Sequence, residues 1–356
     1  MQLEALGFDS FFQNAANGAL SQDMRLARVL TVDRDSYLIQ GADAAPVRGE
    51  VAGRLLFNTD SAMNFPAVGD WVAAHYFDDD TFAVIQDILP RKTVLKRKTS
   101  GKKVAYQMIA ANIDTAFIVQ SLNGDFNLRR LERYLVMIHD GGIEPILLLS
   151  KSDLVASGDM DEKVRRVHAV MTGLPVLAVS SRSGAGIEDF KKRLTPGKTY
   201  CLVGSSGVGK TTLLNGLLGE SAFETRSVRQ KDGRGRHATS RRQLVFLANG
   251  AMIIDTPGMR ELGNIGVETG LQDVFEDIKL LAAECRYRDC SHMDVKGCAV
   301  EAAVKAGTLP KDRYQSYIKL ARESRYNEMS YLEKRRRDKA FGKMVKSVMK
   351  NKKNRP

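Results

Sequence analysis

The sequence predicts an α/β protein made of three successive folded regions. Short apolar runs separated by turns occupy residues 26–89, near-continuous apolar runs alternate with helical periodicity from residue 113, and three cysteines gather with a histidine inside residues 285–298. These patterns are typical of a small antiparallel β-barrel, a doubly wound parallel sheet and a metal-holding helical region, in that order. We expect a flexible leader at 1–25, a barrel and basic linker at 26–100, the α/β domain at 101–265, the helical region at 266–330 and a basic tail at 331–356.

The composition favours several cores and argues against a membrane-spanning chain. At 356 residues the chain exceeds one ordinary core, and a hydrophobic content of 43% is enough to fill two or three. It shows neither an N-terminal signal pattern nor an apolar run near the roughly 18 residues that a span requires. We therefore expect a soluble, cytoplasmic protein with no membrane partner.

Most of the net charge of +12 lies in the C-terminal tail. Residues 331–356 contain eleven lysines and arginines against Glu333 and Asp338, a net +9 that leaves +3 for the rest of the chain. Such a segment binds a polyanion, either RNA or an anionic membrane, and its short apolar stripe makes us favour RNA. The stripe consists of Phe341, Met344, Val345 and Val348.

Five short runs before residue 90 predict the strands of an antiparallel barrel of the OB (oligonucleotide-binding) type. They are apolar and bounded by turn residues, and another small β-domain is the alternative. The predicted strands are 27–32, 36–39, 53–57, 70–75 and 81–85. In residues 90–103, seven of fourteen side chains are basic, which indicates a linker that is either a solvated charge run or an RNA contact.

From residue 113 the chain alternates strands and helices. The strands are near-continuous apolar runs, as expected for a parallel sheet buried on both faces, so the region predicts a doubly wound domain. The predicted strands are 115–120, 145–149, 176–179, 199–203, 244–247 and 252–254, with helices at 128–138, 164–171 and 187–194.

The stretch from Gly204 to Thr211 has the spacing G-x-x-x-x-G-K-[ST] between a predicted strand and a predicted helix. In such a phosphate loop, backbone N–H groups turn toward the phosphates, Lys210 supplies positive charge to the β and γ oxygens, and the Thr211 hydroxyl ligates Mg²⁺. A glycine-rich turn is the alternative, which this context disfavours. We assign phosphate binding to Gly204, Ser205, Ser206, Gly207, Val208, Gly209, Lys210, Thr211 and Thr212, and count Lys210 as catalytic as well.

A nucleotide-switch element follows the phosphate loop. Asp255-Thr-Pro-Gly258 comes at the end of a predicted strand, and in D-x-x-G elements the Asp holds Mg²⁺ while the Gly amide senses the γ-phosphate. The polar, glycine-rich segment before it contains Thr239, the best candidate for another metal ligand. The predicted magnesium ligands are Thr211, Thr239 and Asp255.

The base-recognition elements precede the phosphate loop instead of following the switch. Ser150-Lys151-Ser152-Asp153 ends one predicted strand, where the guanine motif N-K-x-D would stand, and Ser180-Ser181 ends the next. Asp153 can accept hydrogen bonds from guanine N1–H and N2–H, which adenine does not offer, while the Lys151 stem covers the ring. We assign base binding to Ser150, Lys151, Asp153, Ser180 and Ser181, although Ser150 in place of Asn weakens the guanine assignment. The order of motifs predicts a circularly permuted GTPase domain.

Four potential metal ligands stand within fourteen residues: Cys285, Cys290, His292 and Cys298. Three thiolates and one imidazole with no open position suit one structural, tetrahedral Zn²⁺. Incidental thiols beside a surface histidine are the alternative. The fourth cysteine, Cys201, falls in a predicted strand and is expected to pack in the core. Helices are predicted around the cluster at 271–283, 298–305 and 311–326.

A barrel, a permuted nucleotide switch and a zinc cluster in this order resemble the circularly permuted, small-ribosomal-subunit-dependent GTPases of bacteria, the RsgA or YjeQ type. The resemblance covers roughly residues 26–320, and Ser150 and Ser181 depart from the usual motifs. It implies a monomeric GTP hydrolase that binds the small (30S) ribosomal subunit and its rRNA, acts in late maturation, cycles between GTP and GDP with Mg²⁺, and is stimulated by the subunit. The alternatives are a nucleotide-gated RNA-binding scaffold, or the same chemistry on the large subunit or another structured RNA.

Hydrolysis requires a group that orients the attacking water, and Met259 replaces the glutamine that often follows D-x-x-G. The resemblance implies a histidine of the first switch in this role, and His237 stands there, two residues before Thr239. We therefore expect His237 to be catalytic together with Lys210 and Thr239. A loop histidine that contacts phosphate or RNA is the alternative.

Overall fold

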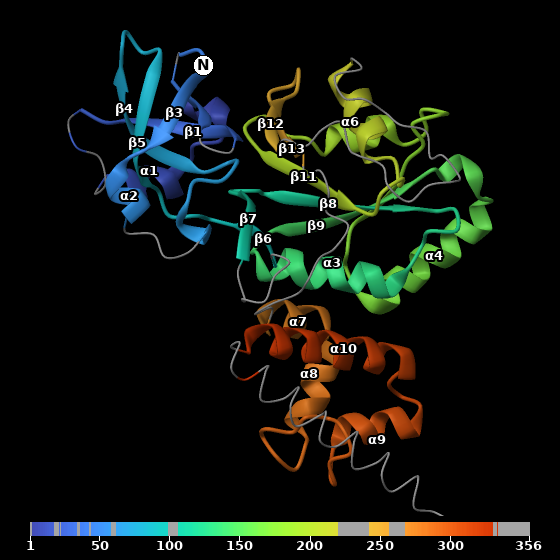
Figure 1. Ribbon diagram of the computed structural model, residues 1–356. Helices are drawn as coiled ribbons and strands as arrows, with labels where there is room; N and C mark the ends of the chain where they lie inside the picture. Colours follow the sequence, from blue (N-terminus) through green and yellow to red (C-terminus); the bar gives the residue numbers. More distant parts are fainter. Residues whose placement is uncertain are drawn as a thin grey trace, which may run out of the picture.

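The computed structural model describes residues 2–17, 21, 23–33, 36–42, 44–57, 62–98, 106–219, 242–255, 268–329 and 333. Figure 1 shows a β-rich N-terminal region, a central sheet flanked by helices, and a group of C-terminal helices. The strand order β10-β9-β8-β11-β13-β12-β1-β2-β3-β5-β4 runs through both β-containing regions, which the pairing of Thr31 with Gln243 connects.

Five strands close into the N-terminal barrel, because β1 pairs with both β2 and β4. All their neighbours are antiparallel except β3 and β5, which are parallel. Val29, Ile39 and Ile85 are among the side chains that fill the interior. The predicted OB-like barrel is confirmed. Its strands are β1 (Arg25–Val32), β2 (Tyr37–Gly41), β3 (Val47–Val51), β4 (Trp71–Phe77) and β5 (Phe82–Ile88).

The strand predicted at residues 53–57 is wrong, because Gly53–Phe57 forms the short helix α2 and the third barrel strand is Val47–Val51. The α2 segment contains leucine, which favours helices, and no β-branched residue, and none of its side chains is buried. By contrast, Val47 and Gly49 of β3 alternate with exposed Arg48 and Glu50. A second short helix, η2 (Ala62–Asn64), precedes β4.

The first part of the segment predicted as a flexible leader forms two short helices. Residues Leu3–Leu6 form the 3-10 helix η1, and Ser10–Ala16 form α1, whose N-terminus is capped by the Asp9 carboxylate. Leu6 and Phe12 are buried, and the Phe12 ring lies 5.9 Å from the Trp71 ring, centroid to centroid. The scattered aromatic residues of this segment therefore belong to a small core beneath the barrel.

The basic stretch predicted as a linker forms part of a hairpin. Strand β6 (Val94–Lys98) pairs antiparallel with β7 (Tyr106–Ala111), and Leu95 is buried between them and the central domain. Its charged side chains have local partners: Arg97 donates to the Gln107 side chain at 2.9–3.0 Å, and Lys96 lies 3.1 Å from Asp140.

The central sheet is parallel apart from β12, with helices on both faces, which confirms the doubly wound α/β domain. Helix α3 covers one face with Leu131 and Leu135, and helices α5 and α6 cover the other with Phe190 and Leu213. The strands are β8 (Thr115–Ser121), β9 (Glu144–Ser150), β10 (Val176–Ala178), β11 (Thr199–Gly204), β12 (Gln243–Phe246) and β13 (Met252–Asp255). The helices are α3 (Leu128–Asp140), η3 (Ser152–Leu154), α4 (Ser157–Val170), α5 (Ile187–Lys192) and α6 (Lys210–Leu218).

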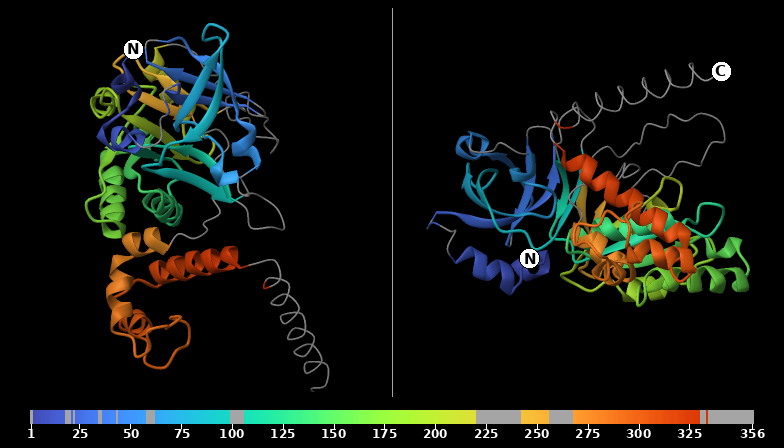
Figure 2. Two further views of the ribbon diagram at one scale, coloured as in Figure 1. Left: turned by 90° about the vertical axis from the view of Figure 1, so that its left-hand side faces the viewer. Right: turned by 90° about the horizontal axis from the view of Figure 1, so that it is seen from below.

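The C-terminal helices lie against α3, on the side away from α6 (Figure 1 and Figure 2). Leu271, Phe275 and Ile278 extend the core that α3 shares with the sheet. Among the residues described, no helix is both long and apolar enough to cross a membrane. The helices are α7 (Glu268–Val274), α8 (Glu276–Ala283), α9 (Ala299–Ala306) and α10 (Lys311–Glu328).

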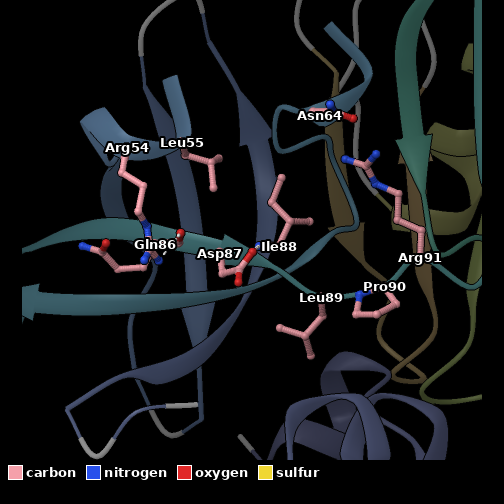
Figure 3. A pocket seen from close by; sticks show the side chains of 9 residues that line it. All are labelled: Arg54, Leu55, Asn64, Gln86, Asp87, Ile88, Leu89, Pro90 and Arg91. Atoms are coloured by element: carbon pink, nitrogen blue, oxygen red, sulfur yellow. Dashed lines mark hydrogen bonds between the residues drawn. The ribbon is translucent and has the colours of Figure 1, made fainter. Parts of the chain in front are cut away.

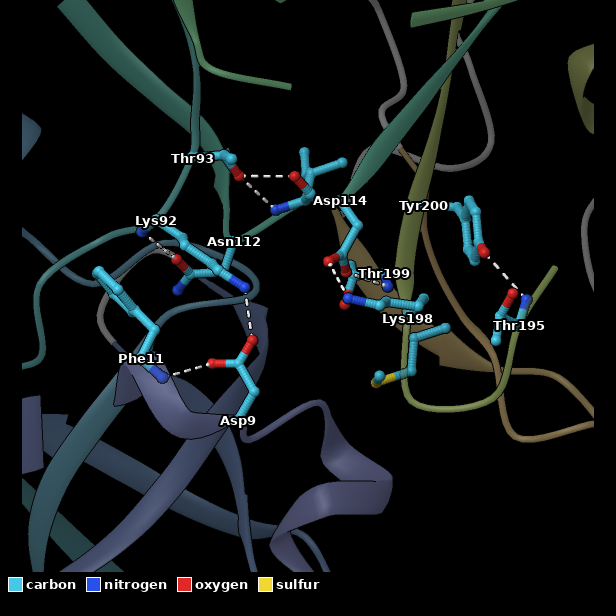
Figure 4. A network of polar contacts seen from close by, with 12 residues as sticks. Asp9, Phe11, Lys92, Thr93, Asn112, Asp114, Thr195, Lys198, Thr199 and Tyr200 are labelled. Atoms are coloured by element: carbon cyan, nitrogen blue, oxygen red, sulfur yellow. Dashed lines mark hydrogen bonds and ion pairs between the residues drawn. The ribbon is translucent and has the colours of Figure 1, made fainter. Parts of the chain in front are cut away.

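The barrel and the central domain meet at a buried arginine. Arg28 of β1 is 1% exposed and donates to the Leu6 carbonyl, to the Asn112 carbonyl at 3.2 Å and to the Thr199 hydroxyl at 2.8 Å. Burial lowers the pKa of Arg28 to about 10. Figure 4 shows a network of polar contacts that includes Asn112 and Thr199, and in it Asp114 accepts from both Lys198 and the Thr199 amide.

Candidate nucleotide and metal sites

The candidate nucleotide site lies at the carboxyl end of the parallel strands. Strand β11 runs into the phosphate loop between β8 and β13, as expected for a ligand at the edge of a doubly wound sheet. Gly204 has φ +151°, and a Cβ there would overlap the Val119 carbonyl oxygen. Gly209 has φ +99° and precedes α6 directly. Both positions require glycine, which lets the loop turn tightly before the helix begins.

Lys210 is held over the phosphate loop. Its ammonium group donates to the Gly204 carbonyl at 2.7 Å and to the Ser205 carbonyl at 2.6 Å. These bonds fix the charge above the N-terminus of α6, where the loop amides and the helix dipole also favour an anion. The loop therefore offers a positive, preformed site for phosphate.

The first base-recognition element is attached to the phosphate loop. The Ser150 hydroxyl, on a residue only 3% exposed, donates to the Val208 carbonyl at 2.6 Å, and the Lys151 ammonium donates to the Gly207 carbonyl at 2.9 Å. Lys151 adopts a left-handed backbone conformation with φ +59°, which directs its side chain back over the loop. From the sequence we assigned Ser150 to base binding, but its hydroxyl contacts the phosphate loop.

Asp153 is held by the second base-recognition element. The fully buried Ser180 donates its hydroxyl proton to Asp153 Oδ1 at 2.6 Å, while its oxygen accepts from the amides of Arg182 and Ser183 at 3.2 and 3.1 Å. The Asp153 side chain is exposed at the strand edge and has a fixed orientation. Ser181, next to Ser180, is exposed on the same turn.

The predicted magnesium ligands fall partly inside the described chain. Asp255 ends β13, which pairs in parallel with β11, so it lies at the same sheet edge as the phosphate loop that carries Thr211. Thr239, Gly258 and the candidate catalytic His237 lie outside the described residues, as does Met259. Their roles stay predictions.

The four residues of the candidate metal centre come together as predicted. Their ligand atoms all lie within 4.8 Å of one another. His292 Nδ1 is 3.6 Å from Cys285 Sγ and 3.5 Å from Cys298 Sγ, and the two sulfurs are 3.9 Å apart. A tetrahedral ion with bonds of about 2.0–2.3 Å separates its ligands by about 3.5–3.8 Å, which is close to the separations among Cys285, His292 and Cys298. The site could therefore hold a metal such as zinc.

Local structure explains how these ligands converge. His292 at φ +56°, Asp294 at φ +53° and Gly297 at φ +84° all have left-handed backbone, so the loop turns tightly between the second and fourth ligands. Cys298 then caps α9 by accepting from the Glu301 amide. Burial lowers the pKa of His292, which favours the neutral imidazole that a metal requires. The remaining cysteine, Cys201, is buried in β11 and packs in the core as expected.

A pocket of about 590 Å³ also lies on the barrel (Figure 3). Its most prominent charge, Arg91, is already engaged by the buried Asp70 at 2.7–2.8 Å and by the Met63 and Phe65 carbonyls. None of its lining residues belongs to the phosphate loop or to the base-recognition elements. It is lined by Arg54, Leu55, Asn64, Gln86, Asp87, Ile88, Leu89, Pro90 and Arg91.

Sequence reasoning missed the burial of one side chain near the phosphate loop. Tyr134 on α3 is 3% exposed and belongs to the same core as Val203 of β11, the strand that runs into the loop. The helical periodicity places residues 131 and 135 on the core face, but nothing in the sequence indicates that the tyrosine between them is buried as well.

Comparison with known proteins identifies the family. The RsgA GTPase family model matches residues 88–265. The chain is 38% identical to the small ribosomal subunit biogenesis GTPase RsgA 2 of Vibrio parahaemolyticus, covering 99% of this chain and 94% of that protein. It is 43% identical to the protein of the same name from Lactiplantibacillus plantarum, covering 89% of each.

Two solved structures share the fold. The crystal structure of YjeQ from Thermotoga maritima matches with a TM-score of 0.61 at 24% identity, covering 83% of this chain and 97% of that one. YloQ, described as a circularly permuted GTPase, matches with a TM-score of 0.60 at 22% identity, covering 87% and 98%. These matches agree with the permuted order of strands and motifs seen here. The chain belongs to the RsgA GTPase family.

Proposed function

We propose that the protein hydrolyses GTP and acts in the maturation of the small ribosomal subunit. The observation that carries the nucleotide assignment is the attachment of the base-recognition strand end to the phosphate loop through Ser150 and Lys151. These elements lie 50 or more residues before the loop, yet they form one site with it. The names of the relatives support the subunit as client.

Guanine recognition rests on Asp153. Its carboxylate, oriented by Ser180, would accept from guanine N1–H and N2–H, and the Lys151 stem would cover the ring. Ser181 completes the edge of the base site. Ser150 contributes indirectly, by holding the loop that receives the phosphates. Adenine lacks the paired donors, so the site favours GTP and GDP over adenine nucleotides.

The phosphate loop would bind the triphosphate through the amides of residues 204–209 and the charge of Lys210. We propose Thr211, Thr239 and Asp255 as ligands of Mg²⁺, with the Gly258 amide sensing the γ-phosphate. When bound, magnesium neutralises charge on the β and γ oxygens. We propose that His237 orients the attacking water, a role that Met259 cannot take.

We propose that Cys285, Cys290, His292 and Cys298 hold one structural zinc ion. The basic tail at 331–356 would contact rRNA through its eleven lysines and arginines. The protein would act as a cytoplasmic monomer without a membrane partner, binding the subunit in the GTP form and leaving after hydrolysis.

Turnover of GTP with and without purified ribosomal subunits tests this proposal. We expect small subunits to raise kcat by at least tenfold and large subunits to have no comparable effect, with GTP outcompeting ATP. Equal rates with and without small subunits would contradict it and favour a nucleotide-gated RNA-binding scaffold. Stimulation by large subunits alone would instead identify another client.

A further inference from the structure

The contact between the central domain and the C-terminal helices is centred on a buried carboxylate. Glu132 of α3 is fully buried. Its carboxylate is bound by Arg129 of the same helix and by two residues of α10, the Arg313 guanidinium at 3.2 Å and the Ser316 hydroxyl. A carboxylate on one element thus depends on donors supplied about 180 residues later in the chain.

Arg313 extends this contact to a third helix. Its side chain, 8% exposed, donates to Asp277 of α8 at 2.6 and 2.8 Å and to the Val274 carbonyl at 2.9 Å. The guanidinium also lies over the Phe275 ring, 4.8 Å from its centre. Arg313 therefore links α3, α8 and α10 in one planar fork of hydrogen bonds.

Two further features hold the same interface. Arg133 of α3 forms a two-pronged pair with Glu323 of α10, at 2.6 and 2.7 Å. At the other helix, a side chain at Gly270 of α7 would overlap the Val136 carbonyl, so the backbones of α7 and α3 are in direct contact. Leu271 and Phe275 continue the apolar core of α3 across this contact.

These contacts oppose two motions of the C-terminal helices relative to α3, namely sliding along it and hinging away from it. A sliding shift would leave Glu132 buried without its α10 donors, which is costly for a carboxylate. A hinge opening would expose the apolar side chains that α7 and α8 share with α3. On its other side, α3 shares a core with Val203 of β11, the strand that runs into the phosphate loop.

We propose that α3 and the C-terminal helices α7, α8 and α10 move as one rigid unit during the nucleotide cycle, with Glu132 and Arg313 as its positioning residues. The metal-bearing region is then coupled through α3 to the sheet whose strand β11 carries the phosphate loop. The proposal deepens the proposed function. It rests on that function only in the experiment that measures turnover stimulated by the ribosomal subunit.

The first test measures amide hydrogen exchange in the full chain with GDP and with a non-hydrolysable GTP analogue. We expect amides of α3 and α10 to respond to the nucleotide together in the wild type. In Glu132→Gln, α10 should exchange at least tenfold faster and lose that joint response, while the matched control Glu323→Gln at the half-exposed rim changes exchange less than threefold. A nucleotide response confined to α10, or Glu132→Gln behaving as the control does, would overturn the proposal.

The second test locks the interface. Cysteines introduced by Arg133→Cys and Glu323→Cys are joined by a short bismaleimide, with a monofunctional maleimide as control and the wild-type chain treated alike to check zinc retention. We expect the joined protein to keep its nucleotide affinities and its subunit-stimulated turnover within twofold. A tenfold loss on joining, with the singly capped protein active, would show that the helices must separate. If wild-type turnover is not stimulated, the proposed function fails, and nucleotide affinity alone decides the inference.

Discussion

Replacing Ser150 by alanine tests whether this residue serves the phosphate loop or the base. The bond to the Val208 carbonyl is 2.6 Å long and the side chain is 3% exposed, so alanine leaves a buried carbonyl without that donor. Such a loss is worth about 1–2 kcal/mol, or roughly a 5- to 30-fold weaker affinity. Because the loop rather than the base is perturbed, GTP, ITP and ATP should all lose the same factor.

Competition titrations against a fluorescent guanine nucleotide measure the three affinities. Ser152→Ala is the matched control, since this neighbouring serine, half-buried in η3, bonds Val179 through its backbone amide, which alanine retains. A Ser150→Ala variant that changes the ratio of GTP to ATP affinity, while leaving the affinity for ATP unchanged, would refute this reasoning and return Ser150 to base recognition.

Three further outcomes are expected. Asp153→Asn should weaken GTP binding by about 2–3 kcal/mol, roughly 30- to 150-fold. It should improve binding of xanthosine triphosphate, whose extra carbonyl suits an amide donor. Competition titration measures both affinities, and an equal loss of affinity for the two nucleotides would contradict the assignment. Cys298→Ser should reduce bound zinc and lower Tm, as measured by metal analysis and calorimetry, whereas Cys201→Ala, a buried thiol whose pKa burial raises to about 12, should retain zinc. Burial lowers the pKa of His139 from 6.5, so as pH falls the histidine of the unfolded chain is protonated before that of the folded chain. The free energy of unfolding should therefore decrease as pH drops below about 6.5. Urea unfolding at several pH values should show a weaker dependence for His139→Asn, and an unchanged slope would exclude His139 as its source.

The sequence alone predicted those elements and sites whose pattern lies within one short segment. Near-continuous apolar runs located the parallel strands because both faces of that sheet are buried, as Phe117 and Ile118 on opposite faces of β8 illustrate. The phosphate loop and the cysteine cluster were found by spacing, since their chemistry fixes the distance between ligands along the chain. Their positions at a strand end and at a helix cap follow from that spacing.

The errors arose where burial is decided by distant residues. The run Leu55-Leu56-Phe57 is apolar, as a buried strand would be, but none of its side chains is buried and it forms a short helix. Phe12 is buried in a core to which the distant residues Trp71 and Leu89 contribute, which no local pattern indicates. Likewise, the role of Ser150 depends on its distance from Val208, 58 residues later. Tertiary contacts of this kind override local propensity.

Circular permutation changes which elements contact β12 and β13, the two strands next to the predicted switch segments. Strand β12, which follows the first switch segment, pairs with β1 of the barrel, and Arg242 just before it donates to the Met108 carbonyl of the β6–β7 hairpin at 3.2 Å. Strand β13 ends at Asp255, and the chain next enters the described structure at α7, which packs on α3. Each predicted switch segment is thus next in sequence to an element that contacts a region outside the nucleotide fold. We therefore predict that a rearrangement at the γ-phosphate is transmitted to the barrel through β12 and to the C-terminal helices through α7.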